Sequence, residues 1–173
     1  MKISLLEAPC GLDWLEVKRR ALVTVGLVPK DMPNLEWRKD ILRARHSPIR
    51  YLRFSFMLED IPSWVSVHLV RHVHAQPFVK SQRNDRQSEY DRTKAPQDAP
   101  VNMIWDMNAE ELMNIANKRL CNLASPETRQ VVKGICQLVI ESCPEFDEFL
   151  VPMCDYHNGV CHEMHGCGRC KKG

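Results

Sequence analysis

The residues best suited to chemistry lie close together between positions 68 and 83, where imidazoles, cations and a hydroxyl group share one short stretch. They are His68, Arg71, His72, His74, Ser81 and Arg83. Guanidinium groups bind anions through paired, directed donors, and imidazole and hydroxyl groups add further hydrogen bonds. We therefore expect this stretch to bind an anion such as a phosphate. The competing interpretation is a solvated polar face, because most charged side chains are simply exposed.

One arginine from a distant part of the sequence belongs with this cluster. Arg119 lies beside the apolar stripe of a predicted helix, between Ile115 and Leu123. An arginine aimed towards a protein core is costly unless an anion meets it. Its position therefore favours a binding pocket over a solvated surface.

A second group of candidate ligands gathers in the C-terminal segment, where cysteine and histidine recur at short intervals: Cys154, His157, Cys161, His162, His165, Cys167 and Cys170. The pairs Cys154–His157 and Cys167–Cys170 have the two-residue spacing that suits tetrahedral zinc. We predict a structural zinc site from these two pairs together with Cys161. An iron–sulfur centre would need ligation by cysteine alone, which these spacings serve less well. The competing interpretation is a disordered tail with reactive thiols.

The composition limits the classes of function. The chain has 173 residues, enough for one domain with a proper core and a small appendage, and its net charge is +2. A nearly neutral charge argues against a nucleic-acid partner, which would need several cations together. No apolar run approaches the roughly 20 residues that span a bilayer, and the first residues have no signal-peptide pattern. We therefore expect a cytoplasmic protein without a membrane partner, whose eight cysteines are metal ligands or free thiols.

Strands and helices are both predicted around these residues, from period-two and near-helical spacings of apolar side chains. In chain order we predict an edge strand over residues 1–6, helices beginning at Asp13 and Asn34, a strand over 50–58, a helix opening at Asp60 and interrupted by Pro77, a polar surface loop over 84–100, and helices beginning at Asn108 and Ser125. In the helix before Pro77, His68, Arg71 and His72 are spaced at i, i+3 and i+4. Their side chains would therefore meet on one helix face.

The stretch 71–83 reads R-H-V-H-A-Q-P-F-V-K-S-Q-R and resembles the signature R-H-R-x-x-S-x-N-x-x-S-x-R of the flavin-dependent thymidylate synthases. The segment 54–72 resembles the strand and helix that precede this motif in the family. The spacing of Asn108, Asn114 and Arg119 is similar to that of the family's C-terminal site helix. The resemblance covers residues 1 to about 143 in the family's order. It implies an α/β (α+β) fold, a mixed β-sheet flanked by long helices, over residues 1–150, followed by the Cys/His-rich tail over 151–173.

The resemblance also implies roles for individual residues. Those on the nucleotide side would bind deoxyuridine monophosphate (dUMP): His68, Arg71, Ser81, Arg83 and Arg119. Arg119 would be the catalytic residue, contacting the uracil and promoting attack at C5, where a fixed cation meets developing negative charge. Those on the cofactor side would contact FAD: Ser47, His72, Asn108 and Asn114, with His74 taken as a substitute for a lost donor. Methylenetetrahydrofolate would supply the carbon, and NADPH would reduce the flavin.

The departures from the signature fall mainly on the flavin and folate side. Val73, Gln76 and Phe78 replace the motif's second arginine, its serine and its asparagine, and Arg45–His46 replaces a histidine–glutamate pair. The expected activity is transfer of a one-carbon unit from methylenetetrahydrofolate to C5 of dUMP. Two alternatives stay open: methylation or hydroxymethylation of another nucleotide such as dCMP, and an inactive relative that binds nucleotide or nucleic acid. The family's shared sites imply a homo-oligomer, expected to be a tetramer, in which the Ser81–Arg83 arm reaches a neighbouring subunit.

Overall fold

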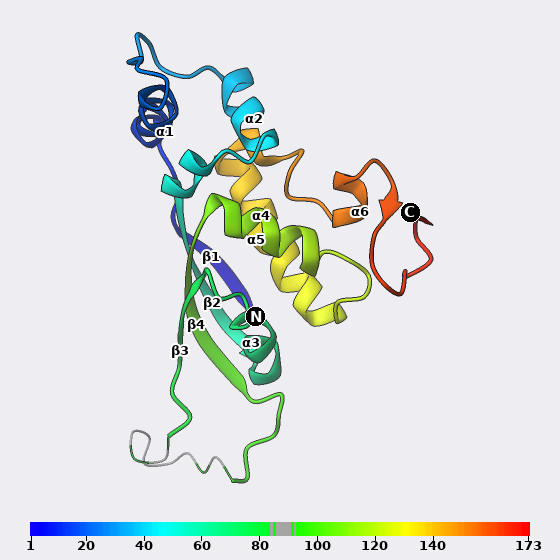
Figure 1. Cartoon of the computed structure of the whole chain (residues 1–173). Coiled ribbons are helices and arrows are strands. Elements are labelled where there is room, and N and C mark those ends of the chain that lie inside the picture. The colour runs from blue at the N-terminus through cyan, green and yellow to red at the C-terminus, as the bar shows by residue number, and fades with distance from the viewer. Residues whose placement is uncertain (84, 86–90, 92) are drawn as a thin grey trace.

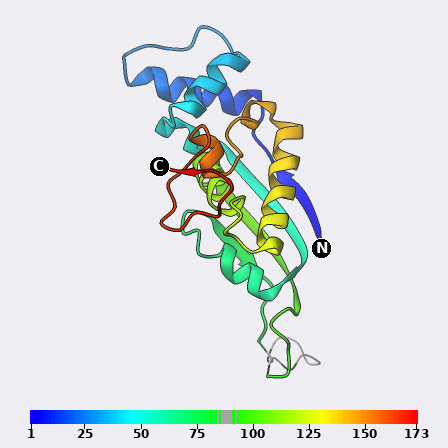
Figure 2. The ribbon, with the colours of Figure 1, turned by 90° about the vertical axis from the view of Figure 1, so that its right-hand side faces the viewer.

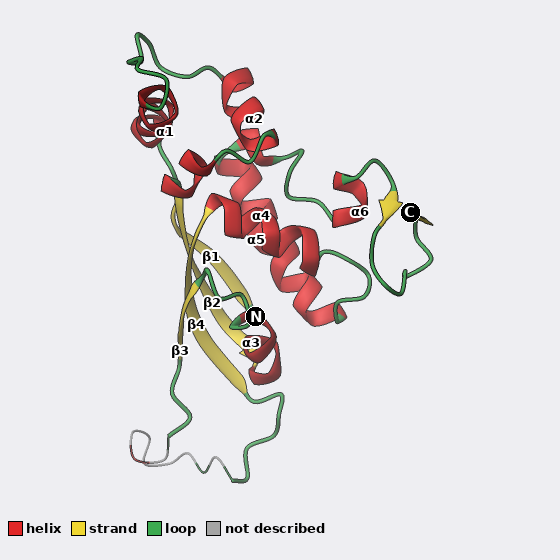
Figure 3. Ribbon diagram, in the orientation of Figure 1, coloured by secondary structure: helices red, strands yellow, loops and turns green. Residues whose placement is uncertain are grey.

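The computed structural model describes residues 1–83, 85, 91 and 93–173 and is built on a four-stranded antiparallel sheet (Figures 1 and 3). In spatial order its strands are β1 (Lys2–Glu7), β2 (Arg53–Pro62), β4 (Pro100–Asn108) and β3 (Gln76–Val79). β1 is an edge strand, as predicted. Helices pack on the sheet, so the α+β class is also confirmed.

The two central strands show why this sheet forms. Along β2, Phe54, Phe56 and Leu58 are buried, and the register places Phe56 opposite Trp105 of β4. This period-two pattern was predicted for residues 50–58, but the strand runs on to Pro62 through a bulge. Asp60 has a φ of 55° in the bulge, and its N–H donates to the side chain of Asn102 at 3.0 Å. The bulge lets pairing resume at the next residue.

Two long helices lie side by side over one face of the sheet, α4 (Ala109–Arg119) and α5 (Pro126–Ser142) (Figures 1 and 2). Both begin where predicted, because a side chain caps each first turn. Asn108 accepts from the N–H of Glu111 at 2.9 Å, and Ser125 accepts from the N–H of Thr128 at 3.3 Å. Gly134 of α5 allows β1 to approach closely, since a Cβ there would lie 2.6 Å from the side chain of Ile3.

Two further helices gather at the end of the sheet where β2 begins, α1 (Gly11–Val23) and α2 (Leu35–Arg43) (Figure 1). The predicted start of α2 is confirmed, since Asn34 caps it by accepting from the N–H of Trp37 at 2.9 Å. The predicted start of α1 at Asp13 is wrong by a few residues. Cys10 is the capping position, and Asp13 accepts from the N–H of Cys10 at 2.8 Å from the third helical position. The short 3-10 helix η1 (Ser47–Tyr51) then leads into β2.

The helix predicted to run from Asp60 to Pro77 is wrong at both ends. α3 covers only Ser63–Leu69, and two successive turns follow it. Pro77 lies in the edge strand β3, opposite Trp105. Proline is tolerated on an edge strand, and pairing with β4 outweighs the local helical spacing. As a consequence His68 is helical, whereas Arg71 and His72 follow the helix, so the three side chains do not share one helix face.

β4 was not predicted, although its sequence carries the signal. From Val101 to Met107 the odd-numbered residues are buried and the even-numbered ones are more exposed, which is the alternation of a strand with one buried face. The predicted polar loop over 84–100 overlaps this strand only at Pro100. Residues 84, 86–90 and 92 of that loop lie outside the described residues.

The C-terminal segment folds back towards α4 (Figure 1). After the short turn η3 (Pro144–Phe146) it forms α6 (Met153–Tyr156) and two very short parallel strands, β5 (Val160–Cys161) and β6 (Lys171–Lys172). Of the helices described, none is long and apolar enough to cross a membrane.

Candidate functional site

Two hydrogen bonds to neighbouring residues hold the guanidinium of Arg119 in place. It ends α4, and its Nε donates to Nε2 of His72 at 2.9 Å while Nη2 donates to the carbonyl of His68 at 3.1 Å. Burial lowers the pKa of Arg119 below its ordinary value, and the positive charge of Arg71 lowers it further. Both effects disfavour the charged form, so an anion bound beside Arg119 would relieve them.

His72 orients Arg119 and is itself held by a buried carboxylate. Nδ1 of His72 lies 3.4 Å from Oε1 of Glu111, and these two side chains are only 13% and 6% exposed. A guanidinium group has no acceptor, so Nε2 of His72 must accept from Arg119. We therefore assign the ring proton to Nδ1, which faces Glu111. Glu111, His72 and Arg119 form one carboxylate–imidazole–guanidinium chain.

Further hydrogen bonds between side chains continue from Glu111 along the buried side of α4 to Arg45. Asn114 donates to Oε2 of Glu111 at 3.5 Å and accepts from Nη1 of Arg45 at 2.8 Å. Nη2 of Arg45 donates to Asn117 at 2.5 Å, and Asn117 donates to the carbonyl of Val151 at 2.7 Å. Glu111 and Arg45 were not among the predicted site residues. The signal was the polar spacing 111, 114 and 117 on a helix with apolar neighbours.

Arg119 and His72 line a hollow of about 270 Å³ at the end of α4. Lys118, Cys121 and Glu163 also line this hollow, and Nζ of Lys118 lies 2.9 Å from the Glu163 carboxylate. The hollow therefore combines a fixed guanidinium with a rim that includes one residue of the C-terminal segment. Its size and polarity suit part of a small anionic ligand.

His68 contributes its carbonyl to Arg119, and its ring lines a different hollow of about 390 Å³ beside α3. Nδ1 of His68 lies 3.4 Å from the hydroxyl of Thr128, and the ring packs edge-on against Trp64 with centroids 5.4 Å apart. Gln82 lines the same hollow and donates to the hydroxyl of Ser63 at 3.1 Å. The segment after β3 thus lies along the start of α3, whereas Arg119 lies near its end.

The residues predicted to bind the nucleotide do not all lie close together within one subunit. Arg71 is exposed and close enough to Arg119 to influence its pKa. Ser81 is half-buried, and its hydroxyl accepts from the N–H of Arg83 at 3.3 Å. Arg83 is exposed and pairs with Asp85 through contacts of 2.9 and 2.6 Å. Arg71 therefore lies within electrostatic reach of Arg119, whereas Arg83 pairs with Asp85.

The five residues predicted to contact a flavin fall into two groups. Asn108 caps α4, Asn114 bonds a neighbouring arginine, and His72 holds Arg119, so these three are used by the chain's own hydrogen bonds. Ser47, at the start of η1, and His74, in the turn after α3, are exposed. The two exposed residues offer polar groups to a ligand directly, whereas the other three offer only their remaining polar atoms.

All five predicted metal ligands line one enclosed hollow of about 150 Å³ in the C-terminal segment: Cys154, His157, Cys161, Cys167 and Cys170. His162 lines it too, and Cys121 joins it from the end of α4. The prediction of one shared site is consistent with this placement, although these residues are spread over four short segments.

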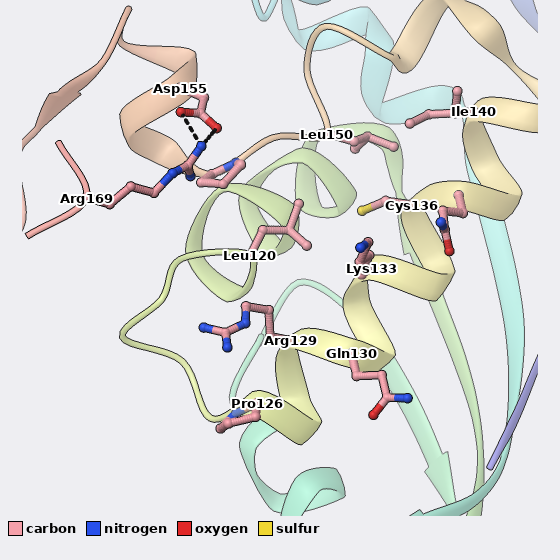
Figure 4. A pocket seen from close by; sticks show the side chains of 12 residues that line it. Leu120, Pro126, Arg129, Gln130, Lys133, Cys136, Ile140, Leu150, Asp155 and Arg169 are labelled. Atoms are coloured by element: carbon pink, nitrogen blue, oxygen red, sulfur yellow. Dashed lines mark hydrogen bonds and ion pairs between the residues drawn. The ribbon is translucent and has the colours of Figure 1, made fainter. Parts of the chain in front are cut away.

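A larger hollow, of about 620 Å³, lies between α5 and the C-terminal segment and is lined by none of the residues predicted for a nucleotide, a flavin or a metal (Figure 4). Arg129 and Lys133 of α5 line it on one side, and the pair Arg169–Asp155 lines it on the other (Figure 4). Since Arg129 belongs to this hollow, it provides a matched control for Arg119.

Comparisons with known proteins agree with the residue pattern. The model of the family described as thymidylate synthase complementing protein matches residues 85–145, which include β4, α4 and α5. A UMP/dUMP methylase, PolB from Streptomyces cacaoi bound with 5-Br dUMP, has a similar fold, with 12% identity over 87% of this chain and 96% of that chain, at a TM-score of 0.66. Two structures of Helicobacter pylori ThyX with FAD and dUMP share 15% identity, at TM-scores of 0.68 and 0.69. They cover 87% and 86% of this chain and 99% of the ThyX chain.

The family model matches less than half of the chain, and together with the shared fold it supports the predicted resemblance to the flavin-dependent thymidylate synthases. The search of curated proteins found no match. The family match contains Asn108, Asn114 and Arg119 but begins after Arg83. The roles assigned to the signature stretch 71–83 therefore stay predictions.

Proposed function

We propose that this protein binds a pyrimidine deoxynucleoside monophosphate beside Arg119 and transfers a one-carbon unit to C5 of its base, with dUMP as substrate. The observation that carries the proposal is the fixed guanidinium of Arg119, held by His72 at 2.9 Å and by the His68 carbonyl at 3.1 Å. The match to the family model supports it, as do structures of similar fold that hold 5-Br dUMP or dUMP.

The chemistry follows from the position of the charge. C5 of a uracil becomes nucleophilic when the ring takes on enolate character, with negative charge shared by C5 and the ring carbonyl oxygen. A cation fixed nearby stabilises that charge without reorganising. Glu111 and His72 keep the Arg119 guanidinium in one orientation. Arg71, exposed beside it, is the residue that we assign to the phosphate.

FAD is the cofactor that the family match and the Helicobacter pylori ThyX structure support. Ser47, His74 and the remaining polar atoms of Asn108 and Asn114 are the groups of this chain that would hold it. When bound, the flavin supplies a hydride for reduction of the one-carbon unit, which we assign to methylenetetrahydrofolate as donor, with NADPH as the source of electrons. His72 is occupied by Arg119, so we assign it to positioning that arginine.

We also infer that the active protein is a homo-oligomer with shared sites, a tetramer by analogy with the family. Arg83 pairs with Asp85 and lies beyond β3, whereas Arg119 lies at the end of α4. In a nucleotide site that uses both arginines, we assign Arg83 to a second chain.

The test combines binding and turnover in the full-length protein. We expect calorimetry to detect dUMP binding, and we expect tritium release from C5-labelled dUMP when FAD, methylenetetrahydrofolate and NADPH are present. Arg119→Ala should reduce release by about 10²–10³-fold, as expected for loss of a group that stabilises transition-state charge. The control Arg129→Ala, on the other hollow, should behave as wild type.

Other outcomes would redirect the proposal. Release from labelled dCMP but not dUMP would change the substrate to the cytosine nucleotide. Binding of dUMP without release, and without any flavin affinity, would make the protein a nucleotide-binding relative. If dUMP failed to bind with and without FAD, the proposal would be wrong.

A further inference from the structure

The C-terminal hollow brings together sulfur atoms from separate parts of the chain. Cys154 comes from α6, Cys161 from β5, and Cys167 and Cys170 from the segment before β6. Cys154 and Cys161 are buried, at 8% and 6% exposed. Isolated buried cysteines are common, but four that face one hollow of about 150 Å³ in so short a segment need a reason.

Two of these sulfur atoms, those of Cys154 and Cys170, lie close to each other. The ligand atoms of Cys154, Asp155 and Cys170 lie within 4.8 Å of one another, the one such group among the residues that the structure describes. β5 and β6 pair in parallel, and the N–H of Gly173 donates to the carbonyl of Cys161 at 3.0 Å, so Cys161 lies beside the segment that follows Cys170. Gly168, with a φ of 80°, turns the chain between the last two cysteines.

An ion pair lies beside the sulfur atoms. Nη1 of Arg169 lies 3.9 Å from Sγ of Cys154, and Nη2 binds the carboxylate of Asp155 at 3.0 and 2.7 Å (Figure 4). The same ion pair occupies Asp155, so its carboxylate is engaged by Arg169 and is not the preferred ligand. Lys118, which also lines the hollow, adds a second cation.

The histidines of the segment are less well placed. His157 and His162 are exposed, and their rings pack against each other with centroids 4.9 Å apart. Four thiolates around a divalent cation carry a net charge of −2, and the cations beside them, Arg169 and Lys118, are paired with Asp155 and Glu163. Zinc accepts a tetrahedral set of four cysteines in structural sites.

We propose that Cys154, Cys161, Cys167 and Cys170 bind one structural zinc ion. The site closes the C-terminal segment against the end of α4, where Cys121, Lys118 and Glu163 line both this hollow and the Arg119 hollow. Zinc binding thereby fixes Glu163 at the rim of the Arg119 hollow, where it pairs with Lys118 at 2.9 Å. The proposal does not depend on the activity proposed above.

The experiment uses the full chain and the metal alone. Elemental analysis of the purified protein should find one zinc per chain. After removal of zinc with a chelator under reducing conditions, titration with Co²⁺ should produce the visible bands of a tetrahedral site and the sulfur-to-metal absorption of four thiolates. The double variant C154S/C170S should lose both. The control C10S, which changes an exposed thiol at the start of α1, should retain them.

A second measurement guards against a variant that fails to fold. In wild-type protein, zinc should protect the four ligand thiols from alkylation, and their labelling, mapped by mass spectrometry, should rise at least ~10-fold after zinc removal. Iron in place of zinc, a cobalt spectrum with fewer than four thiolates, equal metal loading of C154S/C170S, or labelling unchanged by zinc would each overturn the proposal.

Discussion

Nε of Arg119 lies 2.9 Å from Nε2 of His72, so the guanidinium donates to an imidazole rather than to a carboxylate. A carboxylate in direct contact would neutralise the arginine and weaken its attraction for a bound anion. By placing His72 between Glu111 and Arg119, the chain fixes the direction of the guanidinium while leaving its charge available. This arrangement underlies the first two predictions.

His72→Ala should lower kcat by roughly 10²-fold, because a misplaced guanidinium no longer meets the charge that develops on the base. The effect on KM for dUMP should be smaller, since Arg71 remains. His72→Gln should recover part of the loss, because its amide oxygen also accepts from Arg119. Steady-state kinetics of the two variants check this. Equal defects in both would show that accepting this hydrogen bond is not what His72 does.

Glu111→Ala should destabilise the protein by about 1–3 kcal/mol, because it leaves the buried Nδ1–H of His72 without an acceptor. Urea unfolding followed by circular dichroism measures the change. Glu110→Ala is the control, since its partner Arg50 is at the surface and exposed ion pairs contribute less than about 1 kcal/mol. A smaller loss of unfolding free energy for Glu111→Ala than for Glu110→Ala would contradict the buried hydrogen bond between Glu111 and His72.

Mixing two inactive variants should restore activity if sites are shared between subunits. Arg83→Ala and Arg119→Ala each remove one half of the proposed nucleotide site. In a mixed oligomer some sites combine the intact Arg83 of one subunit with the intact Arg119 of another. Tritium release after co-refolding or co-expression measures the recovery. A mixture as inactive as its parents, from variants shown to co-assemble, would place both arginines in the site of one chain or in none.

Stability should fall in alkaline solution because of a buried thiol. Burial raises the pKa of Cys136 to about 12 from an ordinary value of 9.0. Between these values the unfolded chain releases the thiol proton and the folded chain keeps it. The thiol's contribution is therefore complete below about pH 9 and is lost as pH rises towards 12. Denaturant unfolding of wild type and Cys136→Ala should show their stability difference shrinking over this interval; a constant difference would argue against it.

The sequence predicts features that short-range geometry decides. Asn34, Asn108 and Ser125 begin helices because each side chain caps a backbone N–H within its own first turn, and that contact needs no knowledge of the fold. The arginine at the end of α4 was also predictable, because a cation beside an apolar stripe needs a partner.

The sequence did not predict the features that depend on the pairing of β3 with β4. The spacing of His68, Arg71 and His72 fits a helix, but pairing of β3 with β4 ends α3 at Leu69 and turns His72 towards Glu111. The role of Glu111 is hidden for the same reason, since its partner comes from a distant turn. Arg83, which was predicted to bind the nucleotide, pairs in the structure with Asp85, only two residues away in the sequence.

The close approach of Gly134 to Ile3 has a consequence for biosynthesis. β1 leaves the ribosome well before α5, yet it packs against the middle of this helix, more than a hundred residues later in the chain. The face of β1 that packs on α5 therefore stays uncovered until most of the chain has been made. Folding that waits for such distant contacts is slow and exposes apolar strands to aggregation. A nascent chain stalled before Gly134 would consequently depend on chaperones to remain soluble.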